Sequence, residues 1–195
     1  MVGECEEKNM TIDEFWELIE TAGQQSQGDM ECKCAFVQKA VAAMPPDAAI
    51  AFSKYFDESM NRAYTWGLWG AAYVVNGGCG DDTFSDFRAS LISRGKKAFE
   101  SAIADPDSLA DEAFDEEVWF YEGFQYAVHE GAEAAISPEK LTVSAIPNEP
   151  SGTAWEEEPD VLKVLFPKLW KKFGHIWSLP NEPAASKPRP WWKLW

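Results

Sequence analysis

The stretch from Ala72 to Gly95, AYVVNGGCGDDTFSDFRASLISRG, decides how this chain of 195 residues folds. An apolar run leads into the pair Gly77-Gly78, which supplies the left-handed backbone that ends a helix. Apolar side chains then return at helical spacing, at Phe84, Phe87, Leu91 and Ile92. The stretch therefore predicts two helices that pack on either side of a tight corner.

Helical spacing of apolar residues continues on both sides of this corner, and no segment shows the sustained alternation of a strand. Thr11 to Glu14 forms a capping box that opens a first helix, and Thr83 to Asp86 is interpreted as a second cap. Pro167 is expected to kink or break the last helix. Further helices are expected over 30–44, 47–64, 64–76, 96–104, 115–136 and 160–172. We therefore expect an all-α fold with a single bundle-like helical domain.

The ends of this domain follow from composition. We place the helical domain at residues 9–174 and an extended, Pro/Trp-rich C-terminal tail at 175–195. Residues 137–159 are rich in proline and charge, and they are expected to form a loop or a loosely docked crossing. Gly67 and Gly70 weaken a helix, so they predict close approach by a neighbour.

The carboxy-terminal segment that ends in this tail differs in charge from the rest of the chain. Residues 1–158 carry ten basic and 31 acidic side chains, a net charge of −21, whereas residues 159–195 carry seven basic and two acidic ones, a net charge of +5. The tail is expected to dock on the acidic body, with a membrane interface or a groove on a partner as alternatives. Its candidate partner-binding residues are Trp191, Trp192 and Trp195.

The whole chain carries a net charge of −16, which disfavours ordinary electrostatic binding to nucleic acid. The opening MVGECEEKNM does not resemble a secretory signal, and no apolar run is long enough for a transmembrane segment. A cytoplasmic location is therefore expected.

The four cysteines are expected to be reduced thiols. Cys32-Lys33-Cys34 is too tightly spaced for a zinc knuckle, and no metal or cofactor is expected. Cys79, beside glycines and before a helix start, fits the setting of a thiol with a lowered pKa. Neither histidine has a sequence context that pairs it with this thiol as a base, so a Cys-His hydrolase is disfavoured.

The segment from Phe56 to Asp111 contains AYTW, LWGAAY, NGGC, DD, F-x-x-F-R, LI, RG and DPDSL in this order. This pattern resembles a bacterial uncharacterised family, domain of unknown function 4240. Residues 10–22 and 152–174 resemble its two ends, so the similarity spans roughly residues 10–174. The resemblance implies one helical domain with residues 76–94 as its hallmark, and it implies no activity. Residues 89–93 lack the larger aromatic common in that family, and residues 118–126 are more aromatic than expected.

Polar residues at the corner form the candidate site. Asp81 and Asp82 lie at a helix start, where the helix dipole stabilises carboxylates without any ligand. Helical spacing places Arg88 on the inward face, where a cation requires a partner. An internal carboxylate is favoured, from Asp81, Asp82 or Glu122. The alternative is that Arg62, Arg88 and Arg94 converge on an anionic ligand.

Two functions remain open. The first is a non-enzymatic helical binding or regulatory module, one form of which masks a basic protein partner. The absence of a nucleophile and base at readable spacing favours it. The second is an enzyme or a small anionic-ligand sensor that uses a cluster around the 76–94 corner, namely Arg62, Asp81, Asp82, Arg88, Arg94 and Glu122.

Overall fold

A computed structural model describes residues 10–136, 145 and 147–178. Over these residues the chain is helical, without a strand, and the all-α expectation is confirmed. The elements are α1 (Ile12–Ser26), α2 (Met30–Ala42), α3 (Pro46–Arg62), α4 (Trp66–Asn76), α5 (Asp81–Ser93), α6 (Lys96–Ala104), η1 (Pro106–Asp111), α7 (Glu116–Trp119), α8 (Gly123–Ala135), α9 (Pro159–Leu165), α10 (Pro167–Phe173) and η3 (Gly174–Ser178).

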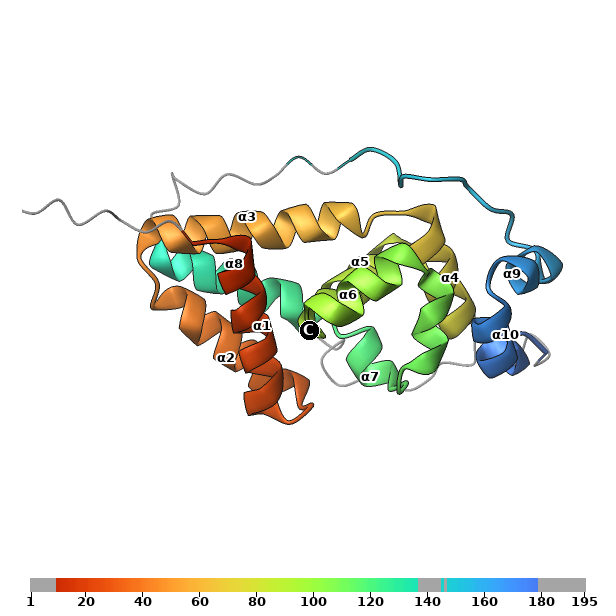
Figure 1. Cartoon of the computed structure of the whole chain (residues 1–195), viewed down its shortest axis with the longest axis horizontal. Coiled ribbons are helices and arrows are strands. Elements are labelled where there is room, and N and C mark those ends of the chain that lie inside the picture. The colour runs from red at the N-terminus through yellow and green to blue at the C-terminus, as the bar shows by residue number, and fades with distance from the viewer. Residues whose placement is uncertain (1–9, 137–144, 146, 179–195) are drawn as a thin grey trace, which may run out of the picture.

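The helices are arranged along the long axis of the molecule (Figure 1). Helices α1 and α2 lie at one end, α4 to α6 occupy the middle, and α9 and α10 lie at the other end. Helix α8 packs against α2, α3 and α5, although it follows them by at least thirty residues in the chain. A helix from late in the chain, α8, therefore completes the core by packing against helices from earlier in the chain.

The predicted caps have mixed outcomes. At α1 the capping box is confirmed, because the Thr11 side chain accepts from the backbone of Glu14 at 3.2 Å and the Glu14 carboxylate accepts from the backbone of Thr11 at 2.8 Å. The cap at Thr83 is wrong. Helix α5 already begins at Asp81, with Gly80 as its N-cap.

The single helix predicted over 115–136 is also wrong, since α7 and α8 are separate. The backbone N–H of Tyr121 donates to the Ser90 hydroxyl at 3.1 Å, and so it bonds to α5 instead of continuing a helix. The ring of Tyr121 covers Gly123, where a Cβ would lie 2.5 Å from the ring. The bend buries both Trp119 and Phe124.

The carboxy-terminal helices are fastened to the middle of the chain. Pro167 separates α9 from α10, as predicted. The buried carboxylate of Asp107, on η1, accepts from the backbone of Lys168 at 3.0 Å and of Leu169 at 2.9 Å, and thereby caps α10.

Residues 174–178 form η3, whereas the sequence predicted extended chain from residue 175. The indole of Trp177 donates to the carbonyl of Val74 at 3.2 Å, so this segment packs on α4. The helical domain therefore continues to residue 178 at least. Trp191, Trp192 and Trp195 lie outside the described residues.

The close approach expected at Gly67 and Gly70 is confirmed. A Cβ on Gly70 would lie 2.6 Å from the ring of Phe166, and one on Gly67 would lie 3.3 Å from Pro106. The indole N–H of Trp155 also reaches α4, where it donates to the carbonyl of Trp66 at 2.8 Å. The described part of the 137–159 segment thus crosses α4 and packs on it.

We expect Gly70→Ala to lower the free energy of unfolding by about 1–3 kcal/mol, because the added methyl overlaps a buried ring. The matched control is Gly23→Ala in α1, where a Cβ meets nothing within 4 Å. That change should raise stability by up to about 1 kcal/mol through helix propensity. Urea unfolding of both variants measures the difference, and equal effects would contradict the packing of α4 described above.

Candidate functional site

The glycine-aspartate corner is held by its own side chains. Gly77 ends α4 with a left-handed φ of 68°, as predicted, and the Asn76 amide donates to the carbonyl of Gly78 at 2.8 Å. The indole of Trp69 donates to the carbonyl of Cys79 at 2.8 Å. A Cβ on Gly77 would lie 2.7 Å from a methyl of Ile176, so η3 covers the corner. The corner is a closed turn.

The pKa of the Cys79 thiol is raised, whereas the sequence predicted a lowered one. Burial, followed by the charges of Asp86 and Asp81, raises the pKa of the Cys79 thiol to about 12. A thiol with such a pKa is protonated at neutral pH and is a poor nucleophile. The setting of a reactive thiol is therefore wrong for this residue. Asp81 and Asp82 are exposed in the first turn of α5, where the helix dipole stabilises them.

Arg88 is buried, as its spacing predicts, and 8% of its surface is exposed. Its Nη1 donates to the carbonyl of Met60 at 2.9 Å, and its guanidinium lies 4.7 Å from the ring centre of Tyr64 and 5.1 Å from that of Phe84. Burial lowers the pKa of Arg88. Its Nε has no hydrogen-bond partner among the described residues.

The expected carboxylate partner for Arg88 is wrong. No ion pair joins it to Asp81, Asp82 or Glu122 within the described chain, and Glu122 is exposed before the first turn of α8. Met60 belongs to the last turn of α3, whose carbonyls carry partial negative charge. The partner of the buried cation is thus a helix end and two aromatic rings.

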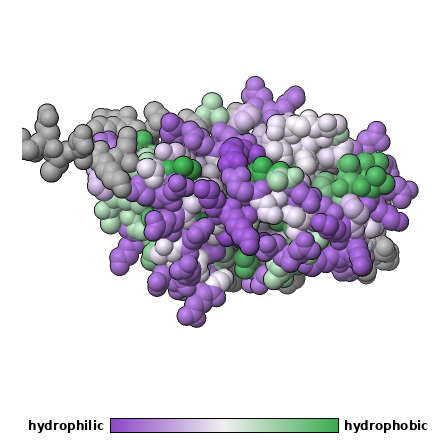
Figure 2. All heavy atoms as spheres, in the orientation of Figure 1, coloured by the Kyte–Doolittle hydropathy of each residue, from purple (hydrophilic) through white to green (hydrophobic). Residues whose placement is uncertain are grey.

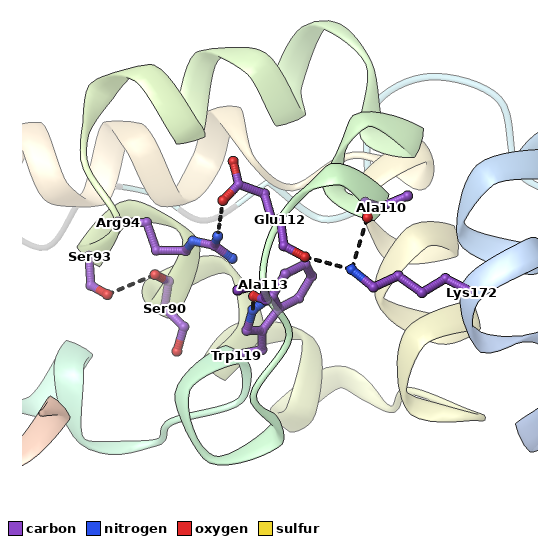
Figure 3. A network of polar contacts seen from close by, with 8 residues as sticks. All are labelled: Ser90, Ser93, Arg94, Ala110, Glu112, Ala113, Trp119 and Lys172. Carbon is purple, nitrogen blue, oxygen red and sulfur yellow. Dashed lines mark hydrogen bonds and ion pairs between the residues drawn. The ribbon is translucent and has the colours of Figure 1, made fainter. Parts of the chain in front are cut away.

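The other two arginines have partners of their own. Arg62 forms two hydrogen bonds with Glu100, at 2.9 and 2.8 Å, which raise the pKa of Arg62 and lower that of Glu100. Arg94 pairs with Glu112 and lies 4.7 Å from the ring centre of Trp119 (Figure 3). The three arginines therefore do not converge, and the predicted cluster is not one site.

A hollow of about 380 Å³ opens instead at the far end of α5. Its walls come from α1, from Lys33 on α2, from the end of α5 at Arg94, and from the start of α6 at Lys97. Only Arg94 among these had been predicted as a site residue. The complete lining is Ile19, Glu20, Gly23, Gln24, Lys33, Ser93, Arg94, Gly95 and Lys97.

Lys33 is the unusual residue of this lining. Its side chain is buried, with 6% of the residue exposed, and its Nζ donates to the carbonyl of Ser93 at 3.2 Å. Within the described chain no carboxylate pairs with it. Burial lowers the pKa of Lys33, Cys34 offsets part of this effect, and the charge of Arg94 adds to the lowering. A buried ammonium without a counter-ion costs folding free energy.

The electrostatics of the hollow are positive. Three cations, Lys33, Arg94 and Lys97, face one lining carboxylate, Glu20, and a second carboxylate, Glu112, that pairs with Arg94. Three positive and two negative charges leave a net +1 in a chain of net charge −16. Helix α6 also starts here, and its N-cap Gly95 offers no side-chain acceptor to the first turn. The hollow suits an anion.

Sequence reasoning missed Lys33 because it treated Cys32-Lys33-Cys34 as a cysteine motif. A signal was present, since Lys33 lies four and eight residues before Val37 and Val41, both buried on α2. That spacing puts all three on one face of a helix. Gln38, one position after Val37, is exposed and donates to Glu130 at 2.9 Å.

The described residues contain neither a group of metal-binding side chains nor a helix that could span a membrane. Within residues 10–136, 145 and 147–178, no three side chains of His, Cys, Asp or Glu group closely enough to hold a metal ion. No helix of the described part is both long and apolar enough to cross a bilayer.

We expect Lys33→Met to raise the free energy of unfolding at pH 7 by about 1 kcal/mol, because it removes an unpaired buried charge. The folded-state pKa of Lys33 lies below its ordinary 10.5, so the unfolded chain binds more protons between these two values. The wild type should gain stability as pH rises through this window, and its deficit relative to Lys33→Met should shrink.

Urea unfolding of both proteins between pH 7 and pH 10.5 measures this deficit. Lys39→Met, an exposed position on the same helix, is the control and should change stability by less than about 0.5 kcal/mol. A destabilised Lys33→Met protein, or a deficit that grows with pH, would contradict the unpaired charge.

Comparison with known proteins agrees with the motifs of the corner. A family profile described as "Protein of unknown function (DUF4240)" matches residues 10–133, which include all of α1 to α7 and most of α8. The profile stops before the 152–174 segment whose resemblance was noted above. Searches of curated proteins and of solved structures found no match. Since the profile covers more than half of the sequence, the chain belongs to the DUF4240 family.

Proposed function

We propose that this protein is a non-enzymatic binding module whose ligand is a small molecule with a carboxylate or phosphate group, held in the hollow between α1, α2, α5 and α6. The observation that carries the proposal is that the buried Lys33 lines the hollow and that its ammonium pairs with no carboxylate of the described chain. An anionic ligand would supply the counter-ion that the fold lacks.

The donors are arranged to share an anion. Lys33 has three N–H donors, of which one reaches Ser93, and the exposed Lys97 lines the same hollow. The first-turn N–H groups of α6 add donors without a side-chain cap. Arg94 contributes charge but is already held by Glu112 and Trp119. A volume of about 380 Å³ falls within the range of small-ligand sites.

Binding is favoured over catalysis by what surrounds the hollow. Its lining contains no histidine and no cysteine, so neither a thiol nucleophile nor an imidazole base is present there. The ligand would touch four helices, and it would thereby stabilise their arrangement. A cytoplasmic setting is supported by the free thiols of Cys32, Cys34 and Cys79, which persist in a reducing compartment.

Isothermal calorimetry and thermal unfolding with inorganic phosphate and with malonate test the proposal, with sodium chloride at equal ionic strength as the reference. We expect both anions to raise the melting temperature, because they bind the folded state alone. Lys33→Met and Lys97→Gln should each weaken binding about tenfold, the loss of one charge-assisted contact, while Lys39→Met should not. No saturable binding of either anion to the folded wild type would refute this function.

A second function, the masking of a basic protein, is favoured by the charge of residues 105–122. This segment carries eight acidic residues and no basic one. Asp111 and Glu117 are exposed and pair with no cation of the described chain. Hydrophilic side chains are spread over the face shown in Figure 2, between more apolar patches.

Binding of a lysine-rich peptide at low salt, followed by calorimetry, tests this second function. The double variant Asp111→Asn, Glu117→Gln should weaken it, whereas Asp47→Asn on α3 serves as an exposed acidic control. Equal binding of the peptide by the wild type, the double variant and Asp47→Asn would count against residues 105–122 as the binding segment.

A further inference from the structure

Lys33 differs from every other lysine of the described chain in its surroundings. The remaining lysines, Lys39, Lys54, Lys96, Lys97, Lys163, Lys168, Lys171 and Lys172, are all exposed. Among these lysines Lys33 alone is buried, and it lines the hollow without a carboxylate partner for its amino group in the described chain. Its setting is that of a reactive amine, since a lysine that is desolvated beside another cation holds more of the neutral, nucleophilic form.

The neighbours of Lys33 determine which electrophile can reach it. Lys97 and the start of α6 line the same hollow and attract an anion. A ligand anchored there by its anionic group would place the remainder of its structure next to the Lys33 amine. Holding two reactants in one site in this way accelerates their reaction, because the encounter no longer costs translational freedom.

We propose that Lys33 captures the carbonyl group of an anionic aldehyde or 2-oxo acid as a reversible imine, an inference that rests on the anion-binding function proposed above. The Nζ lone pair attacks the carbonyl carbon and forms a C–N bond, which gives a carbinolamine. The two amine hydrogens and the carbonyl oxygen then leave as one water molecule, and a C=N bond remains. No electrons are gained or lost, and hydrolysis returns both partners.

The neighbouring thiol does not compete for the electrophile. Cys34 follows Lys33 on α2 and is buried, and burial raises the pKa of its thiol to about 11. Its thiolate is therefore scarce at neutral pH, and a thiohemiacetal at this position is disfavoured. The amine of Lys33 is therefore the nucleophile in the proposed reaction.

The test is reductive trapping at pH 7 with sodium cyanoborohydride, which reduces an imine to a stable secondary amine. The full chain is incubated with glyoxylate, an aldehyde that carries a carboxylate, or with propanal, a neutral aldehyde of similar size. Peptide mass mapping then gives the labelling rate at each lysine. We expect glyoxylate to label Lys33 at least about tenfold faster than Lys39, because anchoring and a neutral amine act together. Propanal should show a weaker preference for Lys33, because it lacks the anionic group that anchors glyoxylate.

Phosphate and the variants complete the test. Phosphate should slow the labelling of Lys33 by glyoxylate, and Lys97→Gln should slow it as well, while Lys39→Met should leave it unchanged. Labelling of Lys33 at or below the rate of Lys39, or equal preference with propanal, would overturn the imine. If phosphate still binds the hollow in that case, the imine is wrong and the anion-binding function stands. If phosphate does not bind, the anion-binding function itself has failed.

Discussion

The contact of the Arg88 guanidinium with the carbonyl end of α3 is the constraint on which the rest of the structure depends. It joins α5 to the end of α3, and the rings of Tyr64 and Phe84 lie against the cation. Helix α5 is thereby fixed near its middle. Its far end then delivers Arg94 and the carbonyl of Ser93 to the hollow, where the latter meets Lys33. The buried Arg88, near the middle of α5, therefore helps to position a second buried cation, Lys33, at the far end of that helix.

Local signals in the sequence predicted the local structure well. The capping box at Thr11, the left-handed end of α4 at Gly77 and the break at Pro167 each depend on residues within a few positions of one another, and each is confirmed. The break between α7 and α8 was missed because its cause lies elsewhere in the chain, in a hydroxyl of α5 that takes the N–H of Tyr121. Helical period alone cannot reveal a competing hydrogen bond of this kind.

The site was harder to predict than the fold. Burial of Arg88 follows from its helical spacing, but its partner is a backbone carbonyl. A sequence analysis that looks for carboxylate partners cannot identify a carbonyl partner of this kind. The pairings of Arg62 with Glu100 and of Arg94 with Glu112 join different helices and depend on tertiary packing. Lys33 was within reach, since its spacing from Val37 already placed a lysine on a buried face.

The cap that Asp107 places on α10 sets a limit on where this protein can be divided. Residues 10–133 carry the family signature, yet a fragment that ended at residue 133 would keep the Asp107 carboxylate and lose the two amides that satisfy it. Such a fragment would also lack Phe166, which packs on Gly70, and Ile176, which packs on Gly77. The face of α4 that they cover would then be exposed to water. The carboxy-terminal helices therefore satisfy polar groups and cover apolar surface of the segment that carries the family signature, and we infer that they belong to the same folding unit.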